Sequence, residues 1–279
     1  MINVLSWNVS HQAMDGERRY YSFSIPCSAK RQPTTCLNNV ANYLLTVAHN
    51  FDIICIIEAT DKLKTKLSFI DKDVLEFRDP SRAPEMMLVY YNSSYRVKRK
   101  TIVVYARRII CIIEFDNNVI FIGAHLPHPK IVENEHINYL FDILRDNLSD
   151  IPDLSNYIII IVGDFNTESD PDNLQINGVI MNANILGPKT CYTVVKIPRV
   201  SGAAQLMPMQ FAYDRIFASL SVHNFQVHDL PDSKVFSDHL PISAAISARR
   251  KIPLAISMDP FLGMYGGAIH RLFNFWKQL

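Results

Sequence analysis

The chain has 279 residues, of which 48% are hydrophobic and 20% are charged, so it has enough apolar material for a folded core and too much for a disordered protein. Its formal net charge is +1, from 28 Lys and Arg against 27 Asp and Glu, which excludes a global field that attracts polyanions. Any contact with nucleic acid must therefore come from local basic patches. A large α/β fold can reach this length as one domain.

The cysteines and the N-terminal sequence both bear on the compartment. The number of cysteines is odd, and Cys55 and Cys111 lie inside apolar runs where thiols behave as small hydrophobes. We therefore expect every cysteine to be reduced: Cys27, Cys36, Cys55, Cys111 and Cys191. No secretory leader precedes the first strand-like run, and no apolar stretch approaches the ~20 residues that a membrane span needs. These features predict an intracellular protein of the cytoplasm or nucleus without a transmembrane segment.

Runs rich in β-branched and aromatic residues recur along the chain and predict strands. In chain order they are Ile2 to Trp7, Asp52 to Ile57, Met86 to Tyr91, Val97 to Tyr105, Ile109 to Phe115, Val119 to Ala124, Tyr157 to Val162, Phe211 to Ala218 and Ile242 to Ser247. The residues from Asp116 to Asn118 join two of these runs and predict a hairpin turn. Other runs, such as Tyr157 to Val162, are apolar throughout, which is typical of strands buried on both faces.

Two further segments show the apolar period of a helix. The first face collects Leu37, Val40, Ala41, Leu44, Leu45 and Ala48, and the second collects Ile137, Leu140, Phe141, Leu144 and Leu148. This many strands imply more than one sheet, and both helices would cover a sheet. The sequence therefore predicts a sandwich of two sheets with helices outside. Residues 10–34 and 187–208 are rich in polar residues and indicate long loops, which are commonly binding loops in a compact domain.

Polar side chains that could bind a metal stand at the ends of the apolar runs. They are Asn8, Glu58, His125, Asp164, Asn166, Asp238 and His239. Since ligands of α/β sheets bind beyond the strand ends, convergence of these ends would form one polar pocket. Each position taken singly also allows a structural interpretation. The Asp and Asn residues would be ordinary turn formers, Glu58 would be a surface residue, and Asp214 with Arg215 would be a salt-bridged pair within a strand. The coincidence of all of them favours a functional site.

A series of short motifs contains these residues. It consists of Ser6-Trp7-Asn8-Val9, Ile56-Ile57-Glu58, Gly123-Ala124-His125-Leu126, Gly163-Asp164-Phe165-Asn166, Tyr213-Asp214-Arg215-Ile216 and Ser237-Asp238-His239-Leu240-Pro241. In content, order and spacing the series resembles the endonuclease/exonuclease/phosphatase superfamily over residues 1–248. The resemblance implies an α/β catalytic domain, a four-layered α/β sandwich of two packed mixed β-sheets with helices on the outer faces. It also implies a hydrolase of phosphate esters that depends on a divalent metal.

The resemblance assigns a role to each motif residue. The implied catalytic residues are His125, Asp164, Asn166, Asp214 and His239, the substrate-binding residues are Asn8, Asn166 and Arg215, and the metal ligands are Glu58, Asn8 and Asp238. Glu58 would be the main ligand of Mg²⁺ or Mn²⁺, hard cations that prefer oxygen. Asp164 would orient or deprotonate the attacking water, and Asp214 would polarise His239. That leaves His125 to stabilise the phosphorane or to protonate the leaving oxygen.

The departures from the family pattern concern the substrate rather than the chemistry. Ile57 stands where many relatives have Gln, and Cys191-Tyr192-Thr193 lacks the Trp of a Thr-Trp pair. The string from Ala212 to Ile216 resembles nucleases and tyrosyl-DNA phosphodiesterases more than inositol phosphatases. The favoured function is hydrolysis of nucleic-acid phosphodiester bonds, with DNA ahead of RNA as the partner. The alternatives are a phosphoinositide or other lipid or sugar phosphate hydrolase, and a catalytically silent binding module, which would not need every acid and base.

Basic and aromatic residues outside the motifs allow two interpretations each. One basic cluster comprises Arg96, Lys98, Arg99, Lys100, Arg107 and Arg108, and another comprises Arg18, Arg19, Lys30 and Arg31. They would contact phosphates or, for the run from Arg96 to Lys100, protect a solvated strand edge. Tyr20, Tyr21 and Phe23 would stack on bases or pack under their loop. Residues 249–279 form a C-terminal extension with an amphipathic pattern, which we expect to dock on the domain as a helix rather than to bind a membrane surface or a protein partner.

Overall fold

The fold is described from a computed structural model for residues 1–11, 14, 33–79, 86–129, 132, 134–183, 189–192, 209–230 and 237–247. The predicted C-terminal extension at 249–279 lies outside these residues, as do Arg18, Arg19, Lys30 and Arg31 and the aromatic residues between them.

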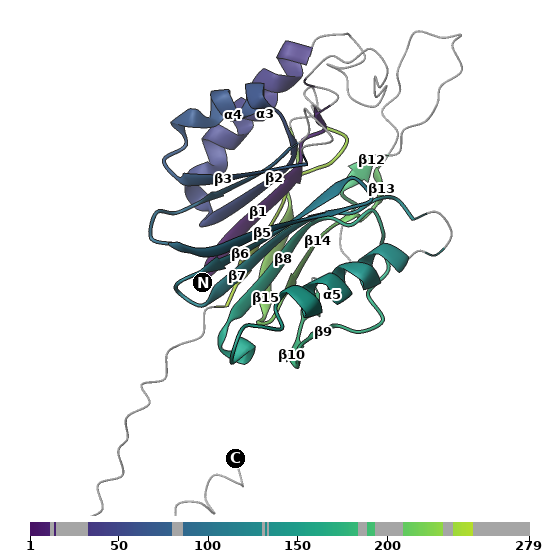
Figure 1. The fold of residues 1–279 in the computed structure, drawn as a ribbon. Helices are drawn as coiled ribbons and strands as arrows, with labels where there is room; N and C mark the ends of the chain where they lie inside the picture. Colours follow the sequence, from purple (N-terminus) through teal and green to yellow (C-terminus); the bar gives the residue numbers. More distant parts are fainter. Residues whose placement is uncertain are drawn as a thin grey trace, which may run out of the picture. The chain divides into compact units, whose positions relative to one another are not determined.

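The described part of the chain contains two six-stranded sheets (Figure 1). The first sheet has the order β15-β16-β1-β2-β4-β3, with β1 (Ile2–Asn8), β2 (Ile53–Ala59), β3 (Asp73–Arg78), β4 (Met86–Tyr91), β15 (Val222–Val227) and β16 (Ile242–Ile246). The second sheet has the order β11-β14-β8-β7-β6-β5, with β5 (Val97–Tyr105), β6 (Arg108–Phe115), β7 (Val119–His125), β8 (Ile158–Asp164), β11 (Asn182–Ala183) and β14 (Asp214–Ala218). Both sheets are mixed, because β1 runs parallel to β2 and β7 runs parallel to β8, while their other pairs are antiparallel.

The described residues also include two short strand pairs, three α-helices and three 3-10 turns. Two short antiparallel pairs form from β9 (Gln175–Ile176) with β10 (Val179–Ile180), and from β12 (Cys191–Tyr192) with β13 (Met209–Phe211). The α-helices are α3 (Pro33–Val47), α4 (Asp61–Lys66) and α5 (Glu135–Asn147), and the 3-10 turns are η1 (Ala48–Asn50), η2 (Leu67–Phe69) and η3 (Leu154–Asn156). Among the described residues no helix combines the length and the apolar character needed to cross a membrane.

The apolar residues form three layers, which confirms the predicted sandwich. One cluster joins α3 and α4 to the first sheet through residues such as Leu44 and Leu63, a second fills the space between the sheets, and a third joins α5 to the second sheet through residues such as Leu140 and Phe141. Strand β8 is buried along its whole length, because it faces the other sheet on one side and α5 on the other. Helices therefore cover both outer faces, and the architecture is the four-layered α/β sandwich.

The cysteines give one correction and one agreement with the sequence. Cys36 in α3 is disulfide-bonded to a cysteine whose side chain lies outside the described residues, so the expectation that all cysteines are reduced is wrong. That expectation therefore no longer supports a reducing compartment. Cys55 on β2 and Cys111 on β6 are free and buried. Burial raises the pKa of both thiols, that of Cys111 to about 12.

Candidate active site

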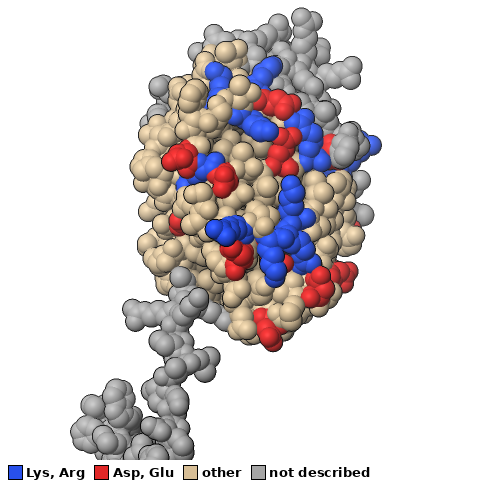
Figure 2. Space-filling model, turned by 60° about the vertical axis from the view of Figure 1, so that its left-hand side comes forward, with Lys and Arg blue, Asp and Glu red and all other residues tan. Residues whose placement is uncertain are grey.

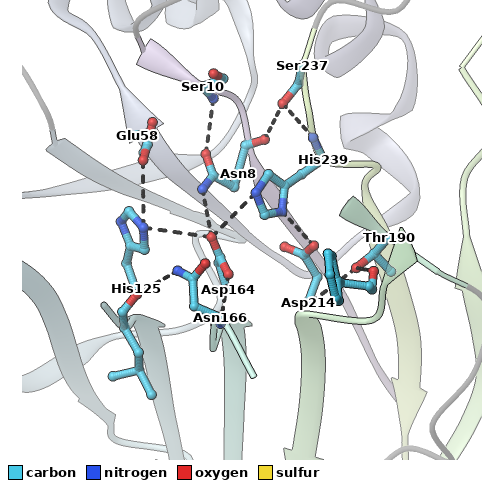
Figure 3. A network of polar contacts seen from close by, with 12 residues as sticks. Asn8, Ser10, Glu58, His125, Asp164, Asn166, Thr190, Asp214, Ser237 and His239 are labelled. Carbon is cyan, nitrogen blue, oxygen red and sulfur yellow. Dashed lines mark hydrogen bonds and ion pairs between the residues drawn. The ribbon is translucent and has the colours of Figure 1, made fainter. Parts of the chain in front are cut away.

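The ends of strands from both sheets meet at one end of the sandwich (Figure 3). Parallel pairing of β7 with β8 sets His125 beside Asp164, and antiparallel pairing of β8 with β14 sets Asp164 beside Asp214. A cavity of about 180 Å³ opens there, lined by Asn8, Ser10, Glu58, Arg108, His125, His128, Asp164, Asn166, Asp238 and His239. All of these side chains are polar, so the cavity suits a charged ligand rather than an apolar one.

Left-handed backbone conformations aim several side chains at the cavity. Ser10 has φ 56°, Glu58 has φ 58° and Asn166 has φ 52°, in a region that residues other than Gly seldom adopt. Glu58 also lies in a β-bulge of β2, between Ile56 and Ala59, which re-aims its side chain away from the regular alternation of the strand. Such conformations cost ~1–3 kcal/mol each and persist where the surroundings hold them, commonly at functional sites.

Gly163 explains why a glycine precedes Asp164. Its φ is 156°, and a Cβ atom at this position would stand 1.9 Å from the carbonyl oxygen of Ala124 on β7. Any side chain would therefore push β7 and β8 apart at the point where they place His125 beside Asp164. The glycine of the Gly-Asp motif is a requirement of strand pairing.

Asp164 is the centre of the polar network in Figure 3. Its Oδ2 accepts a hydrogen bond from Asn8 Nδ2 at 2.9 Å, and its Oδ1 accepts one from the backbone N–H of Asn166 at 3.0 Å. The same Oδ2 faces Nε2 of His239 at 3.6 Å and Nε2 of His125 at 3.7 Å. Two histidines therefore face one fixed carboxylate across the cavity.

Asp214 and the backbone hold the ring of His239 in place. His239 Nδ1 lies 2.8 Å from Asp214 Oδ2, and the His239 main chain is held by Ser237 Oγ, which accepts its N–H at 3.2 Å, and by Trp7 Nε1, which donates to its carbonyl at 2.9 Å. Burial raises the pKa of Asp214 from its ordinary value, while His239 acts in the opposite direction. The contact with Asp214 favours the tautomer protonated at Nδ1, so Nε2 is the nitrogen presented to Asp164 and the cavity.

Glu58 is surrounded by basic groups. His11 Nδ1 lies 2.9 Å from its Oε2, while Arg108 Nη1 and His125 Nε2 lie 3.3 Å and 3.6 Å from its Oε1. Burial alone would raise the pKa of Glu58, but the hydrogen bond with His11 and the nearby His125 and Arg108 outweigh it and hold the pKa below its usual range. Glu58 is therefore an ionised carboxylate at neutral pH.

The donor set of the cavity fits a hard divalent cation. Glu58, Asp238 and Asn8 supply oxygen ligands from three different segments. Burial raises the pKa of Asp238, and the Glu58 carboxylate raises it further, so a cation between the two carboxylates would relieve their repulsion. Ligand atoms of Asp164, Asp214 and His239 also lie within 4.8 Å of one another, so these three buried residues form a second group that could hold a metal ion.

The structure brings nearly all of the predicted site residues together. Asp214 contacts His239 from behind the cavity. Seven others line the cavity itself: Asn8, Glu58, His125, Asp164, Asn166, Asp238 and His239. One amide hydrogen of Asn166 is used internally, because Nδ2 donates to the carbonyl of Leu126 at 2.6 Å.

Arg215 is the exception. Neighbouring residues of a strand point to opposite faces, so Arg215 turns toward the α5 side while Asp214 turns toward His239. Its side chain is 1% exposed, its Nη1 donates to the carbonyl of Ser169 at 2.8 Å, and its guanidinium pairs with Asp170 and lies over the Phe217 ring at 4.7 Å. This placement argues against the predicted role in substrate binding, because Arg215 anchors the loop that follows Asn166.

Sequence reasoning missed several residues that line the cavity or contact its lining. Arg108 stood out only as part of a basic cluster, yet its guanidinium reaches Glu58 from the start of β6. His11 gave no signal, because it falls in a segment interpreted as a polar loop. His128 was not among the predicted site residues, but it lines the cavity, its ring makes a T-shaped contact with that of Tyr213, and burial lowers its pKa.

The basic run on β5 behaves as a strand edge. Lys98 Nζ lies 2.6 Å from Glu114 Oε1, and Arg99 Nη1 lies 2.7 Å from Asp150 Oδ2, so both cations have acidic partners. Figure 2 shows one face of the molecule on which Lys and Arg side chains lie beside Asp and Glu side chains rather than forming a patch of one sign. Of the two predicted roles for this run, these ion pairs favour the solvated edge.

Comparisons with known proteins agree with the fold. Danio rerio TDP2 in complex with a single-strand DNA product is 14% identical, with 88% of this chain and 99% of that chain covered and a TM-score of 0.59. The human Nocturnin catalytic domain with a bound sulfate anion is 17% identical (88% and 94% covered, TM-score 0.60), and ANGEL2, a 2′,3′-cyclic phosphatase, is 12% identical (87% and 94% covered, TM-score 0.62). A search of curated protein sequences gave no match. The profile of the Endonuclease/Exonuclease/phosphatase family matches residues 5–239, and the chain therefore belongs to this family.

Proposed function

We propose that this protein is a divalent-metal-dependent phosphodiesterase that hydrolyses nucleic-acid phosphodiester bonds by in-line attack of an activated water. The observation that carries the proposal is the row of Asp214, His239 and Asp164, which faces a wholly polar cavity opposite Glu58. A silent binding module has no need for a histidine fixed by one buried carboxylate and aimed at another.

Each side chain has a part in the proposed reaction. A Mg²⁺ or Mn²⁺ ion bound by Glu58, Asp238 and Asn8 would polarise the phosphate and offset its charge. Asp164 orients the attacking water and takes its proton, because its carboxylate is fixed by hydrogen bonds and faces the cavity. His239, supported by Asp214, carries positive charge beside the phosphate oxygens in the transition state.

The remaining cavity residues act on the leaving group and on substrate position. His125, which faces Asp164 from the side opposite His239, protonates the leaving oxygen or stabilises the phosphorane. Asn8 and Asn166 donate amide hydrogens to phosphate oxygens. Arg108 adds a permanent cation that a phosphate group can share with Glu58.

Nucleic acid is the substrate class that the site favours. The cavity offers amide and guanidinium donors for phosphate, and the described residues that line it include no apolar side chain that would receive a lipid chain. Two of the similar structures contain a DNA product or an adenosine derivative, which supports the proposal by analogy of fold.

A substrate screen tests the proposed function. The purified protein is incubated with Mg²⁺ and single-stranded DNA, double-stranded DNA, RNA, 5′-tyrosyl DNA and phosphoinositides, each with and without excess EDTA. We expect cleavage of a nucleic acid that EDTA abolishes, and a loss of at least ~10²-fold in the Glu58→Gln variant. Undiminished cleavage in EDTA contradicts the metal requirement. Cleavage of phosphoinositides alone supports the lipid hydrolase, and binding of nucleic acid without any cleavage supports the silent module.

A further inference from the structure

Three aromatic side chains form a cluster at the end of β5, in which Tyr139 is exposed and Tyr105 and His136 are partly buried. Tyr105 ends the strand, while His136 and Tyr139 stand three residues apart on the same side of α5. The ring centroids of Tyr105 and Tyr139 are 4.3 Å apart with an interplanar angle of 33°, and the Tyr105 hydroxyl lies 2.8 Å from His136 Nδ1. We call Tyr105, His136 and Tyr139 the aromatic shelf.

Tyr105 packs against the apolar core beneath α5, whereas Tyr139 is not part of that core. The helix is held against the second sheet by Ile137, Leu140, Phe141 and Leu144, each of which is fully buried. Tyr139 belongs to none of the buried clusters and is 45% exposed. The hydrogen bond with His136 holds the Tyr105 ring in place, and this ring supports the exposed Tyr139 ring that a ligand can reach.

The shelf lies next to the cavity, because Tyr105 of the shelf pairs across two strands with Arg108 of the cavity. Tyr105 on β5 is directly opposite Arg108 on β6, so their Cα atoms are about 5 Å apart. The Arg108 side chain extends from there into the cavity and reaches Glu58. A polyanionic chain with one phosphate at Arg108 would therefore pass next to the shelf.

We infer that the aromatic shelf stacks a base of a nucleic-acid substrate next to the phosphate that is cleaved. The inference rests on the proposed function and extends it, because it assigns a binding site for the base as well as for the phosphate. Aromatic side chains beside a cationic phosphate contact are the combination that binds single-stranded nucleic acid without regard to sequence. The substrate is accordingly a strand whose bases are unpaired at the site of cleavage.

The test compares substrates with and without bases. Tyr139→Ala, Tyr139→Phe and the parent are assayed with Mg²⁺ on a single-stranded oligonucleotide, on an abasic chain of equal length and charge, and on bis(p-nitrophenyl) phosphate. Phe69→Ala is the matched control, because Phe69 is 85% exposed and lies in η2 on the opposite outer face of the sandwich. For Tyr139→Ala we expect kcat/KM on the oligonucleotide to fall about tenfold, mainly through KM, with little change on the two baseless substrates. Tyr139→Phe keeps the ring and should retain most of the parent's activity on the oligonucleotide.

The outcomes separate this inference from the proposed function. If the parent cleaves the oligonucleotide and the abasic chain equally well, or if Tyr139→Ala matches Phe69→Ala on the oligonucleotide, the shelf is not a base-binding site while the phosphodiesterase remains. If the parent cleaves only bis(p-nitrophenyl) phosphate, the proposed nucleic-acid substrate fails and the shelf inference fails with it.

Discussion

Replacing Arg215 by Met separates the role predicted from the sequence from the one that the structure assigns. Met fills much of the same space over Phe217 but cannot hydrogen-bond the carbonyl of Ser169 or pair with Asp170. A buried hydrogen bond from a charged group contributes ~1.5–3 kcal/mol. The cation–π contact adds ~0.5–1 kcal/mol. The Asp170 side chain is 51% exposed, so this ion pair adds little.

One contribution to the free energy of unfolding opposes these losses of stability. Arg215 Nε is buried without a hydrogen-bond partner among the described residues, so the substitution also removes an unfavourable group. We therefore expect a net loss of about 2 kcal/mol in the free energy of unfolding, or ~4–8 °C in Tm for a domain of this size.

Thermal unfolding and steady-state kinetics measured on the same samples decide between the two roles. Arg215→Met should lower Tm while KM stays within about twofold of the parent, because the guanidinium does not reach the cavity. Lys64→Met is the matched control, since Lys64 makes an exposed pair with Glu76 and should change stability by less than ~0.5 kcal/mol. An unchanged Tm together with a tenfold rise in KM would refute the reasoning and restore substrate binding by Arg215.

Three further predictions concern the core and the thiols. Gly123→Ala should destabilise the fold by ~1–3 kcal/mol in denaturant unfolding, because the new Cβ would lie 2.7 Å from Met87 Sδ and 2.9 Å from Cys111 Sγ between the sheets. An unchanged denaturation midpoint would contradict this prediction and show that the sulfur atoms move aside at no cost. Thiol titration in denaturant without reductant should find three free groups, since the bond at Cys36 uses two of the five cysteines, and a count of five would contradict that bond. In the native protein at pH 8, Cys55 and Cys111 should resist alkylation, because burial and a raised pKa keep both thiols protonated and covered.

Long apolar strands and their order could be predicted because burial on both faces leaves a direct mark on the sequence. The run at β4 was predicted to its exact bounds, and the Asp116 to Asn118 turn joins β6 to β7 as expected. The edge strands β3 and β15 were missed, because their half-exposed residues, such as Glu76 and Asn224, resemble a loop. The predicted strand from Phe211 to Ala218 is interrupted, since β13 ends at Phe211 and β14 begins at Asp214.

The site was predictable as a set of residue types but not as a geometry. Strand-end position suggested Asp164 and His125 because the pairing of parallel strands brings such ends together. Arg215 shared the same motif as Asp214, and only the alternation of side chains along β14 showed that it faces away from the cavity. Arg108 and His11 reach Glu58 from segments distant in sequence, which no local pattern could reveal.

The turnover number of His239→Ala tests the central claim most directly. His239 contacts both Asp214 and Asp164, so its removal should break the network at the reacting phosphate while leaving the core intact. With Mg²⁺ and the best nucleic-acid substrate, we expect the turnover number to fall at least ~10³-fold with little change in Tm. The control is His223→Ala on the exposed face of β15, which should retain the parent's activity. If His239→Ala keeps most of the parent's turnover, the assignment of this cavity as the active site is contradicted.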